Sequence, residues 1–145
     1  MMTRSFLLSF AVLLTACATD GPPYVSSQSA APADMAQVVF YRDTVPLAGA
    51  AWPHHYYVDS QLVAELKIGG FTRVTIAPGK HVIQTGPASN PGFRSQSIEA
   101  MAGRTYFFRE RGTVPAQFSV VPPAEAQAEL ESGYHFQPPV MASSK

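Results

Sequence analysis

The sequence predicts an all-β fold, a small antiparallel β-sandwich or open barrel of seven or eight short strands with a short C-terminal helix. Short runs rich in β-branched and aromatic residues follow one another closely, and Gly/Pro turns separate them. The last such run is followed by a segment rich in Ala and Glu, which favours a helix. With 145 residues, 46% of them hydrophobic, the chain is long enough for one domain and too apolar to be disordered throughout.

Residues 1–16 have the pattern of a bacterial lipoprotein signal peptide. Arg4 provides a positive charge, and the apolar run at 5–14 is too short to span a bilayer. The stretch Leu14-Thr15-Ala16-Cys17 then resembles a lipobox. We predict cleavage before Cys17 and lipidation of its thiol, which also accounts for the single Cys of the chain. The alternative is an ordinary cleaved signal followed by a chance Cys.

The anchored chain is expected in the cell envelope. Ala18 follows Cys17, and in lipoproteins of the enterobacterial type an Asp there resembles an inner-membrane retention signal. We therefore expect the outer membrane, with the domain facing the periplasm. Ten Lys and Arg balance ten Asp and Glu, so neither nucleic acid nor anionic lipid is an expected electrostatic partner. The remainder of 17–35 is expected to be a flexible tether.

The domain is expected to begin near residue 36. The run Gln-Val-Val-Phe-Tyr-Arg at 37–42 is typical of a strand buried on both faces. A Pro-, Gly- and Ala-rich loop follows at 44–53, and a hairpin is expected from strands at 56–58 and 62–66. One face of the second strand is expected to carry its alternating apolar residues, Leu62, Ala64 and Leu66.

Two further hairpins are predicted from Gly-containing turns. The first joins strands at 71–76 and 80–85, and the second joins strands at 93–100 and 104–109. A last short strand is expected at 118–121.

A helix is predicted over residues 124–131. Ala, Glu, Gln and Leu are strong helix formers, Pro123 stands at the start, and Gly133 lies past the end. The β-sandwich domain is therefore expected over 36–133, and residues 134–145 are expected to form a loose C-terminal tail.

Several of these stretches, in this order, resemble the bacterial lipoprotein family catalogued as domain of unknown function 2846. They are Val38–Arg42, Tyr57–Asp59 with Leu62–Leu66, Ala77–His81, Gly103–Arg109 and the closing Ala126–Leu130. The resemblance implies a small β-sandwich on a lipid tether. It brings no established activity, so no catalytic residue is carried over from it.

An aromatic loop is the first candidate binding site. Trp52, Tyr56 and Tyr57 lie close together in the sequence, and exposed aromatic side chains are frequent where proteins meet ligands or partners. They are therefore candidates for a platform that binds sugar rings or a partner protein. The alternative is that they pack in the core and along the edge of the sandwich.

His54 and Arg109 complete the candidate binding residues. His54 and His55 point to opposite faces if they lie on a strand, so they are not expected to chelate one metal ion together. Arg109 is a candidate for an anion or partner contact. Its alternative role is a structural ion pair, for example with Glu99.

The sequence lacks the patterns of the common catalytic and cofactor sites. It has no Gly-x-Ser-x-Gly elbow, phosphate loop or dinucleotide fingerprint. We therefore expect no enzyme, no metal and no cofactor. The expected function is a binding or accessory module for a partner protein of the envelope. The alternatives are a glycan or small-molecule binding domain that uses the loop around Trp52, and a periplasmic enzyme with an unrecognised site.

Overall fold

A computed structural model describes most of the chain after the predicted signal peptide. The described residues are 21–28, 30–43, 52–86, 94–112 and 117–140. The signal peptide, Cys17 and most of the predicted loop at 44–53 lie outside these ranges. Within them, no helix is long and apolar enough to cross a membrane.

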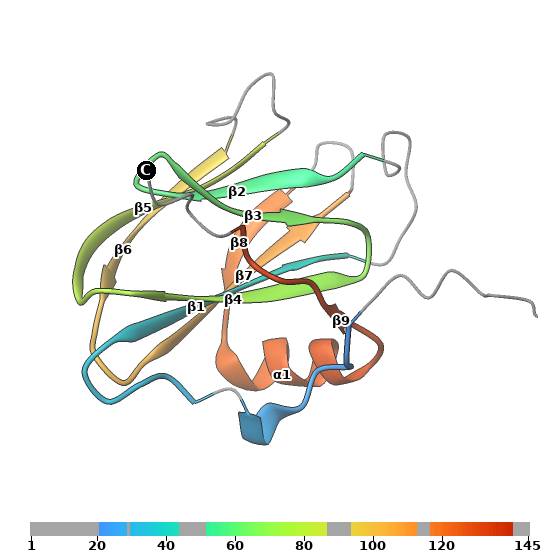
Figure 1. Cartoon of the computed structure of the whole chain (residues 1–145), viewed down its shortest axis with the longest axis horizontal. Coiled ribbons are helices and arrows are strands. Elements are labelled where there is room, and N and C mark those ends of the chain that lie inside the picture. Colours follow the sequence, from blue (N-terminus) through green and yellow to red (C-terminus); the bar gives the residue numbers. More distant parts are fainter. Residues whose placement is uncertain (1–20, 29, 44–51, 87–93, 113–116, 141–145) are drawn as a thin grey trace, which may run out of the picture.

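The described residues form two stacked β-sheets and one short helix (Figure 1), which confirms the predicted sandwich. In the first sheet, with order β8-β7-β1-β4-β9, the strands are β1 (Ala36–Arg42), β4 (Gly70–Ile76), β7 (Thr105–Arg111), β8 (Gln117–Val121) and β9 (His135–Phe136). In the second sheet, with order β3-β2-β5-β6, they are β2 (His54–Val58), β3 (Gln61–Leu66), β5 (Gly79–Gly86) and β6 (Arg94–Ala100). The helix is α1 (Pro123–Glu131), and a 3-10 turn, η1, covers Ser26–Gln28.

Strand β1 is the central strand of the first sheet. It pairs antiparallel with β4 and parallel with β7, so the sheet is mixed rather than purely antiparallel. All seven of its residues are buried, as its unbroken apolar run predicts. Val38 and Phe40 face the second sheet, whereas Val39 and Tyr41 face the side that carries α1.

Alternation along the strands of the first sheet creates two hydrophobic cores. The inner core lies between the sheets and includes Val38, Phe40, Tyr56, Leu66, Ile83, Phe108 and Phe118. The outer core lies on the opposite face of the first sheet and includes Val39, Tyr41, Phe71, Phe107, Val121, Leu130 and Tyr134. The helix buries Ala126 and Leu130 in the outer core.

The two later hairpins predicted from the sequence are wrong. Strand β4 belongs to the first sheet and β5 to the second, and likewise β6 belongs to the second and β7 to the first. In Figure 1 the chain turns a corner between β4 and β5 and enters the other layer. A short Gly-containing connection permits either a hairpin or such a corner, so the local sequence does not distinguish them.

The first hairpin, β2–β3, is confirmed, but its register differs from the predicted alternation. A β-bulge between Tyr56 and Tyr57 pairs Tyr56 with Ala64 and Tyr57 with Leu62. The extra residue inserted by a bulge shifts the facing of the chain beyond it. Consequently Val63, rather than Leu62, packs against the inner core.

Both ends of the described chain pack on the domain, contrary to the predicted tether and loose tail. Tyr24 is 4% exposed and Tyr134 is 6% exposed. The Gly21 amide donates to the Phe136 carbonyl at 3.1 Å, and the Phe136 amide donates to the Pro22 carbonyl at 2.9 Å. Aromatic side chains from both ends cover the outer face of β4. The apolar area buried there stabilises the packing of both ends on the domain. We call residues 21–28 the N-terminal strap.

Candidate functional site

A carboxylate is buried at one end of the inner core. Phe108 and Glu110 share the inward face of β7, and Glu110 is only 1% exposed. Burying a charged side chain is costly unless hydrogen bonds and opposite charge compensate for the lost water. The groups around Glu110 therefore determine whether its buried charge is compensated.

Three side chains contact that carboxylate. The Tyr56 hydroxyl donates to Oε2 of Glu110 at 2.5 Å, and Nδ1 of His54 lies 2.6 Å from Oε1. The Thr85 hydroxyl is a weaker donor at 3.4 Å. Strands β2 and β5 face β7 across the inner core, which brings these donors together. We call Arg42, His54, Tyr56, Thr85 and Glu110 the Glu110 cluster.

Arg42 supplies the positive charge of the cluster. Burial raises the pKa of the Glu110 carboxyl, but hydrogen bonds from His54 and Tyr56 and the charges of His54 and Arg42 outweigh it and leave the pKa below its usual value. The carboxylate therefore stays ionised at neutral pH. Burial and the neighbouring charge of Glu110 raise the pKa of the Tyr56 hydroxyl, which stays protonated as a donor.

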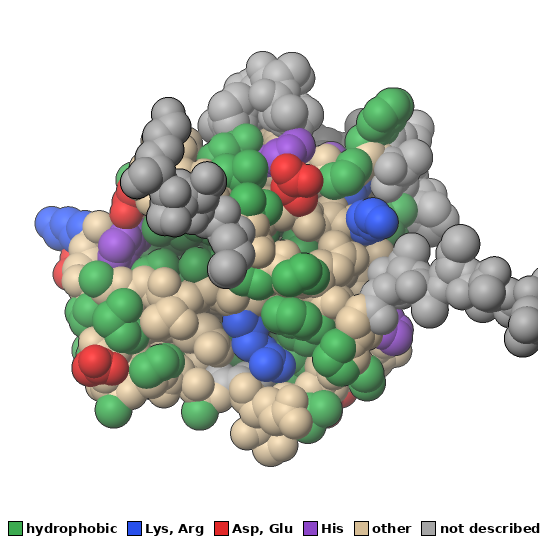
Figure 2. Space-filling view, viewed as in Figure 1, with side chains coloured by type: hydrophobic (Ala, Val, Ile, Leu, Met, Phe, Trp, Pro, Cys, Tyr) green, Lys and Arg blue, Asp and Glu red, His purple; other side chains and the backbone are tan. Residues whose placement is uncertain are grey.

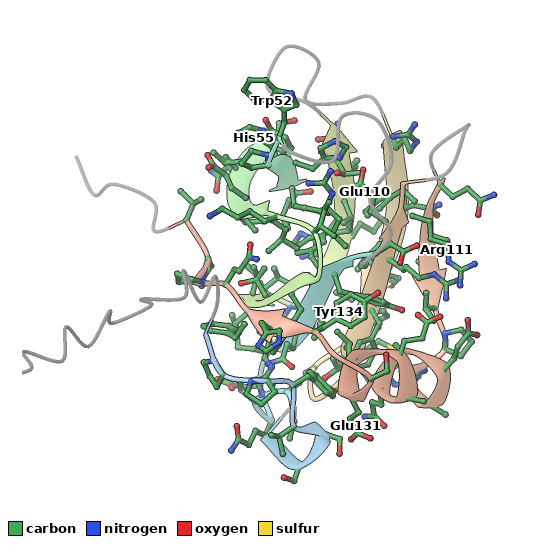
Figure 3. The ribbon with its side chains drawn as sticks, turned by 90° about the vertical axis from the view of Figure 1, so that its right-hand side faces the viewer. Trp52, His55, Glu110, Arg111, Glu131 and Tyr134 are labelled. Carbon is green, nitrogen blue, oxygen red and sulfur yellow. The ribbon has the colours of Figure 1, made fainter. Side chains whose placement is uncertain are left out.

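Arg42 also holds the backbone that carries Trp52. Its guanidinium donates to the Trp52 carbonyl at 2.7 Å and to the Leu66 carbonyl at 3.1 Å. The Trp52 side chain itself is 74% exposed. Figure 3 shows Trp52 and His55 at one end of the molecule and Glu110 farther inside. An exposed aromatic residue is thus joined through its backbone to a member of a buried polar cluster.

The three candidates for an aromatic platform differ in exposure. Trp52 is exposed, but Tyr56 is 0% exposed and belongs to the inner core and to the Glu110 cluster, so it forms no exposed platform. Tyr57 is half-buried, and its ring lies 6.5 Å from the ring of His55. Hydroxyl donation from Tyr56 into the core was not expected from the sequence.

The two neighbouring His residues have separate partners. His54 contacts Glu110, whereas Nε2 of His55 lies 3.2 Å from Glu65. This agrees with their expected placement on opposite faces of a strand. Within the described ranges, no group of three or more His, Cys, Asp or Glu side chains is placed to hold a metal ion.

Arg109 points away from the Glu110 cluster, toward α1. Its guanidinium lies 2.9 Å from Glu125 and 2.5 Å from Glu129 of the helix. The expected partner, Glu99, is therefore wrong, because β6 carries it in the other sheet. Glu129 also accepts a hydrogen bond from the Tyr41 hydroxyl at 2.7 Å. These contacts favour the structural alternative for Arg109, which fastens the helix to the first sheet.

The position of Glu110 in its strand is a signal in the sequence for a buried carboxylate. Glu110 follows Phe108 by two positions on β7, so both side chains point to the same face of the strand. An acidic residue on the same face as a core Phe is expected to be buried. What the sequence did not contain is the identity of its partners, because His54, Tyr56 and Thr85 reach it across the sandwich.

These features define a class of protein: a small two-sheet β-sandwich with a helix on its outer face and a buried, ionised Glu near one end. The chain belongs to the family described as protein of unknown function (DUF2846), whose model matches residues 32–123. The matched region includes both sheets except β9, together with all members of the Glu110 cluster. None of the curated proteins and none of the solved structures matches this chain.

Proposed function

We propose that the protein is a lipid-anchored module of the bacterial cell envelope that binds a partner protein and catalyses no reaction. The lipobox-like residues Leu14–Cys17 support the anchor, and Ala18 supports the outer membrane as its location, with the domain in the periplasm. The end of the sandwich that carries Trp52 is the proposed contact surface.

The exposed Trp52 that Arg42 joins to the Glu110 cluster is the observation that carries this proposal. Trp is enriched among the residues that dominate binding energy at protein interfaces. The hydrogen bond from Arg42 holds the Trp52 backbone before binding, which lowers the entropy cost of ordering it in a complex. Hydrogen bonds from His54 and Tyr56 to Glu110 order the neighbouring end of the inner core, which supports a rigid surface there.

The same geometry argues against acid–base catalysis by Glu110. Both of its carboxylate oxygens already accept hydrogen bonds, and the residue is only 1% exposed. A general acid or base must reach the proton that it transfers. The arrangement is better suited to supporting a binding surface than to performing a reaction.

A crosslinking experiment in intact cells tests the proposal. The full-length protein is crosslinked, captured and compared with Trp52→Ala and Cys17→Ser. The matched control is Val120→Ala, because Val120 is also an exposed hydrophobic residue, at 46% exposure, on a different strand. We expect one stoichiometric partner that the Val120→Ala protein retains and the Trp52→Ala and Cys17→Ser proteins lose.

Two outcomes contradict the proposal. Capture that is equal for the wild type and Trp52→Ala removes Trp52 from the contact surface. Absence of a protein partner, combined with Trp52-dependent binding of glycans to the purified protein, would assign the loop to sugar stacking instead. Cys17→Ser separately tests the anchor, since loss of the lipid should release the protein from the membrane fraction.

A further inference from the structure

A pocket lies between the N-terminal strap and the outer face of β4, away from the Glu110 cluster. Its volume is about 210 Å³, and its walls are formed by Pro22, Pro23, Gln28, Phe71, Arg73 and Phe136. Four of these residues are proline or phenylalanine, so the lining is apolar around one basic side chain. Figure 2 shows that basic side chains are few and dispersed on the visible face of the molecule.

Arg73 is held by two aromatic rings. Its guanidinium carbon lies 5.5 Å from the ring centre of Tyr24 and 5.3 Å from that of Phe71. Cation–π contacts of this kind fix the plane of the guanidinium but do not neutralise its charge. Among the described residues, no carboxylate forms an ion pair with Arg73, and its Nε has no hydrogen-bond partner.

Two other arginines on the same face of the first sheet are treated differently. Arg109 and Arg111 both contact Glu129, and Arg109 also contacts Glu125. The arginines of this face that contact α1 are therefore paired with carboxylates of the helix. At Arg73 the part of the chain that the structure describes supplies aromatic rings and an apolar pocket but no carboxylate.

Tyr24 adds a further unused polar group beside Arg73. The residue is 4% exposed, and among the described residues its hydroxyl has no hydrogen-bond partner. Buried polar groups are usually hydrogen-bonded, so each exception in a native structure calls for an explanation. Tyr24 is not among the residues that line the pocket, so its ring orients Arg73 and its hydroxyl is not a proposed ligand contact.

We propose that this pocket binds a small carboxylate-bearing ligand, with the carboxylate on Arg73 and an apolar body against Pro22, Pro23 and Phe136. Arginine matches the planar carboxylate with paired hydrogen bonds. A phosphate fits less well, because a dianion loses more hydration in a narrow apolar pocket than one guanidinium returns. The carboxylate belongs either to a free small acid or to the C-terminus of a peptide.

The test compares probes that differ only in the carboxylate. The full-length protein in a non-ionic detergent is titrated with 3-phenylpropionate, with its neutral amide and with inorganic phosphate, and binding is followed by calorimetry or by NMR shifts. A tripeptide ending in Phe, with a free or an amidated C-terminus, distinguishes the two sources. We expect saturable binding of a free carboxylate with a Kd on the order of 1 mM or tighter, weakened at least ~10-fold in the amide.

Arg73→Gln provides the matched test on the protein, and Arg104→Gln is its control because Arg104 is an exposed arginine outside this pocket. We expect the Arg73→Gln protein to lose binding ~10-fold or more and the Arg104→Gln protein to keep it. Equal binding of acid and amide, equal binding to the wild type and Arg73→Gln, or a preference for phosphate overturns the proposal. If Arg73→Gln loosens the strap, the acid–amide comparison on the wild type still decides. Trp52-dependent partner capture is independent of every one of these results.

Discussion

Arg109 and Glu110 are adjacent charged residues of β7 that lie in different surroundings. One is on the outer face of the first sheet, and the other is in the inner core. Glu110 points into the inner core and is satisfied by hydrogen bonds from His54 and Tyr56. Arg109 points to the outer face and forms ion pairs with Glu125 and Glu129, of which Glu125 is largely exposed. The same strand therefore carries one charge that is costly to leave unpaired and one that water can still screen. We expect the two to differ severalfold in their contribution to stability.

The largest effect is expected from removing the inner charge. Glu110→Ala leaves the Tyr56 hydroxyl and Nδ1 of His54 without their partner and removes the negative charge near buried Arg42, and we expect a loss of about 3–5 kcal/mol in the free energy of unfolding. Urea denaturation followed by circular dichroism measures it. A loss below about 1 kcal/mol would show that the cluster relaxes by admitting water.

On the outer side, the next largest effect is expected from packing rather than charge. Leu130 is 0% exposed and anchors α1 in the outer core. Leu130→Ala should cost about 2–4 kcal/mol through lost burial and the cavity left behind. The same urea titration measures this change, and Val120→Ala at an exposed position should cost little by comparison.

A smaller effect is expected from the outer ion pairs themselves. Arg109→Ala should cost about 1 kcal/mol, because screening and side-chain entropy offset most of the attraction at partly exposed positions. A double-mutant cycle with Glu129→Ala isolates the pair. A coupling energy as large as the loss in Glu110→Ala would remove the distinction between the two faces.

The smallest expected effect is a change in acid sensitivity. The pKa of Glu110 is lower in the fold than its usual value, so its contribution is present above the unfolded pKa and is lost as the pH falls through the folded pKa. Stability of the wild type should decline in that acidic window. In Glu110→Gln the decline should be shallower, and the corresponding slope should be unchanged in Arg109→Gln. Thermal unfolding at a series of pH values measures both.

Local patterns predicted the elements of this fold better than their partners. The buried run of β1, the β2–β3 hairpin and the helix ending before Gly133 all follow from short-range chemistry. The corner at Ala77-Pro78-Gly79 does not, because choosing between one sheet and two depends on contacts far along the chain. The β-bulge at Tyr56 and Tyr57 is likewise set by both paired strands.

The candidate site shows the same division between local and long-range information. Trp52 was identifiable because a lone Trp beside Pro53 favours a loop. For Tyr56 the sequence left platform and core as alternatives, because its hydroxyl partner, Glu110, is separated from it by 54 positions. Arg73 was not singled out, because its isolation from carboxylates is a property of the folded face and not of its neighbours in sequence.

The backbone pairing of the two chain ends gives the domain a direction of mechanical weakness. If the protein is anchored at Cys17, tension on the anchor loads the strap first, at the bonds from Gly21 to Phe136 and from Tyr24 to Tyr134. Under this tension the hydrogen bonds of the strap break one at a time. In the longer β1–β4 and β1–β7 ladders, many hydrogen bonds resist the force together. Peeling the strap would release residues 21–35, which span about 50 Å when extended. The domain could thus reach farther from the membrane under load while both sheets stay folded.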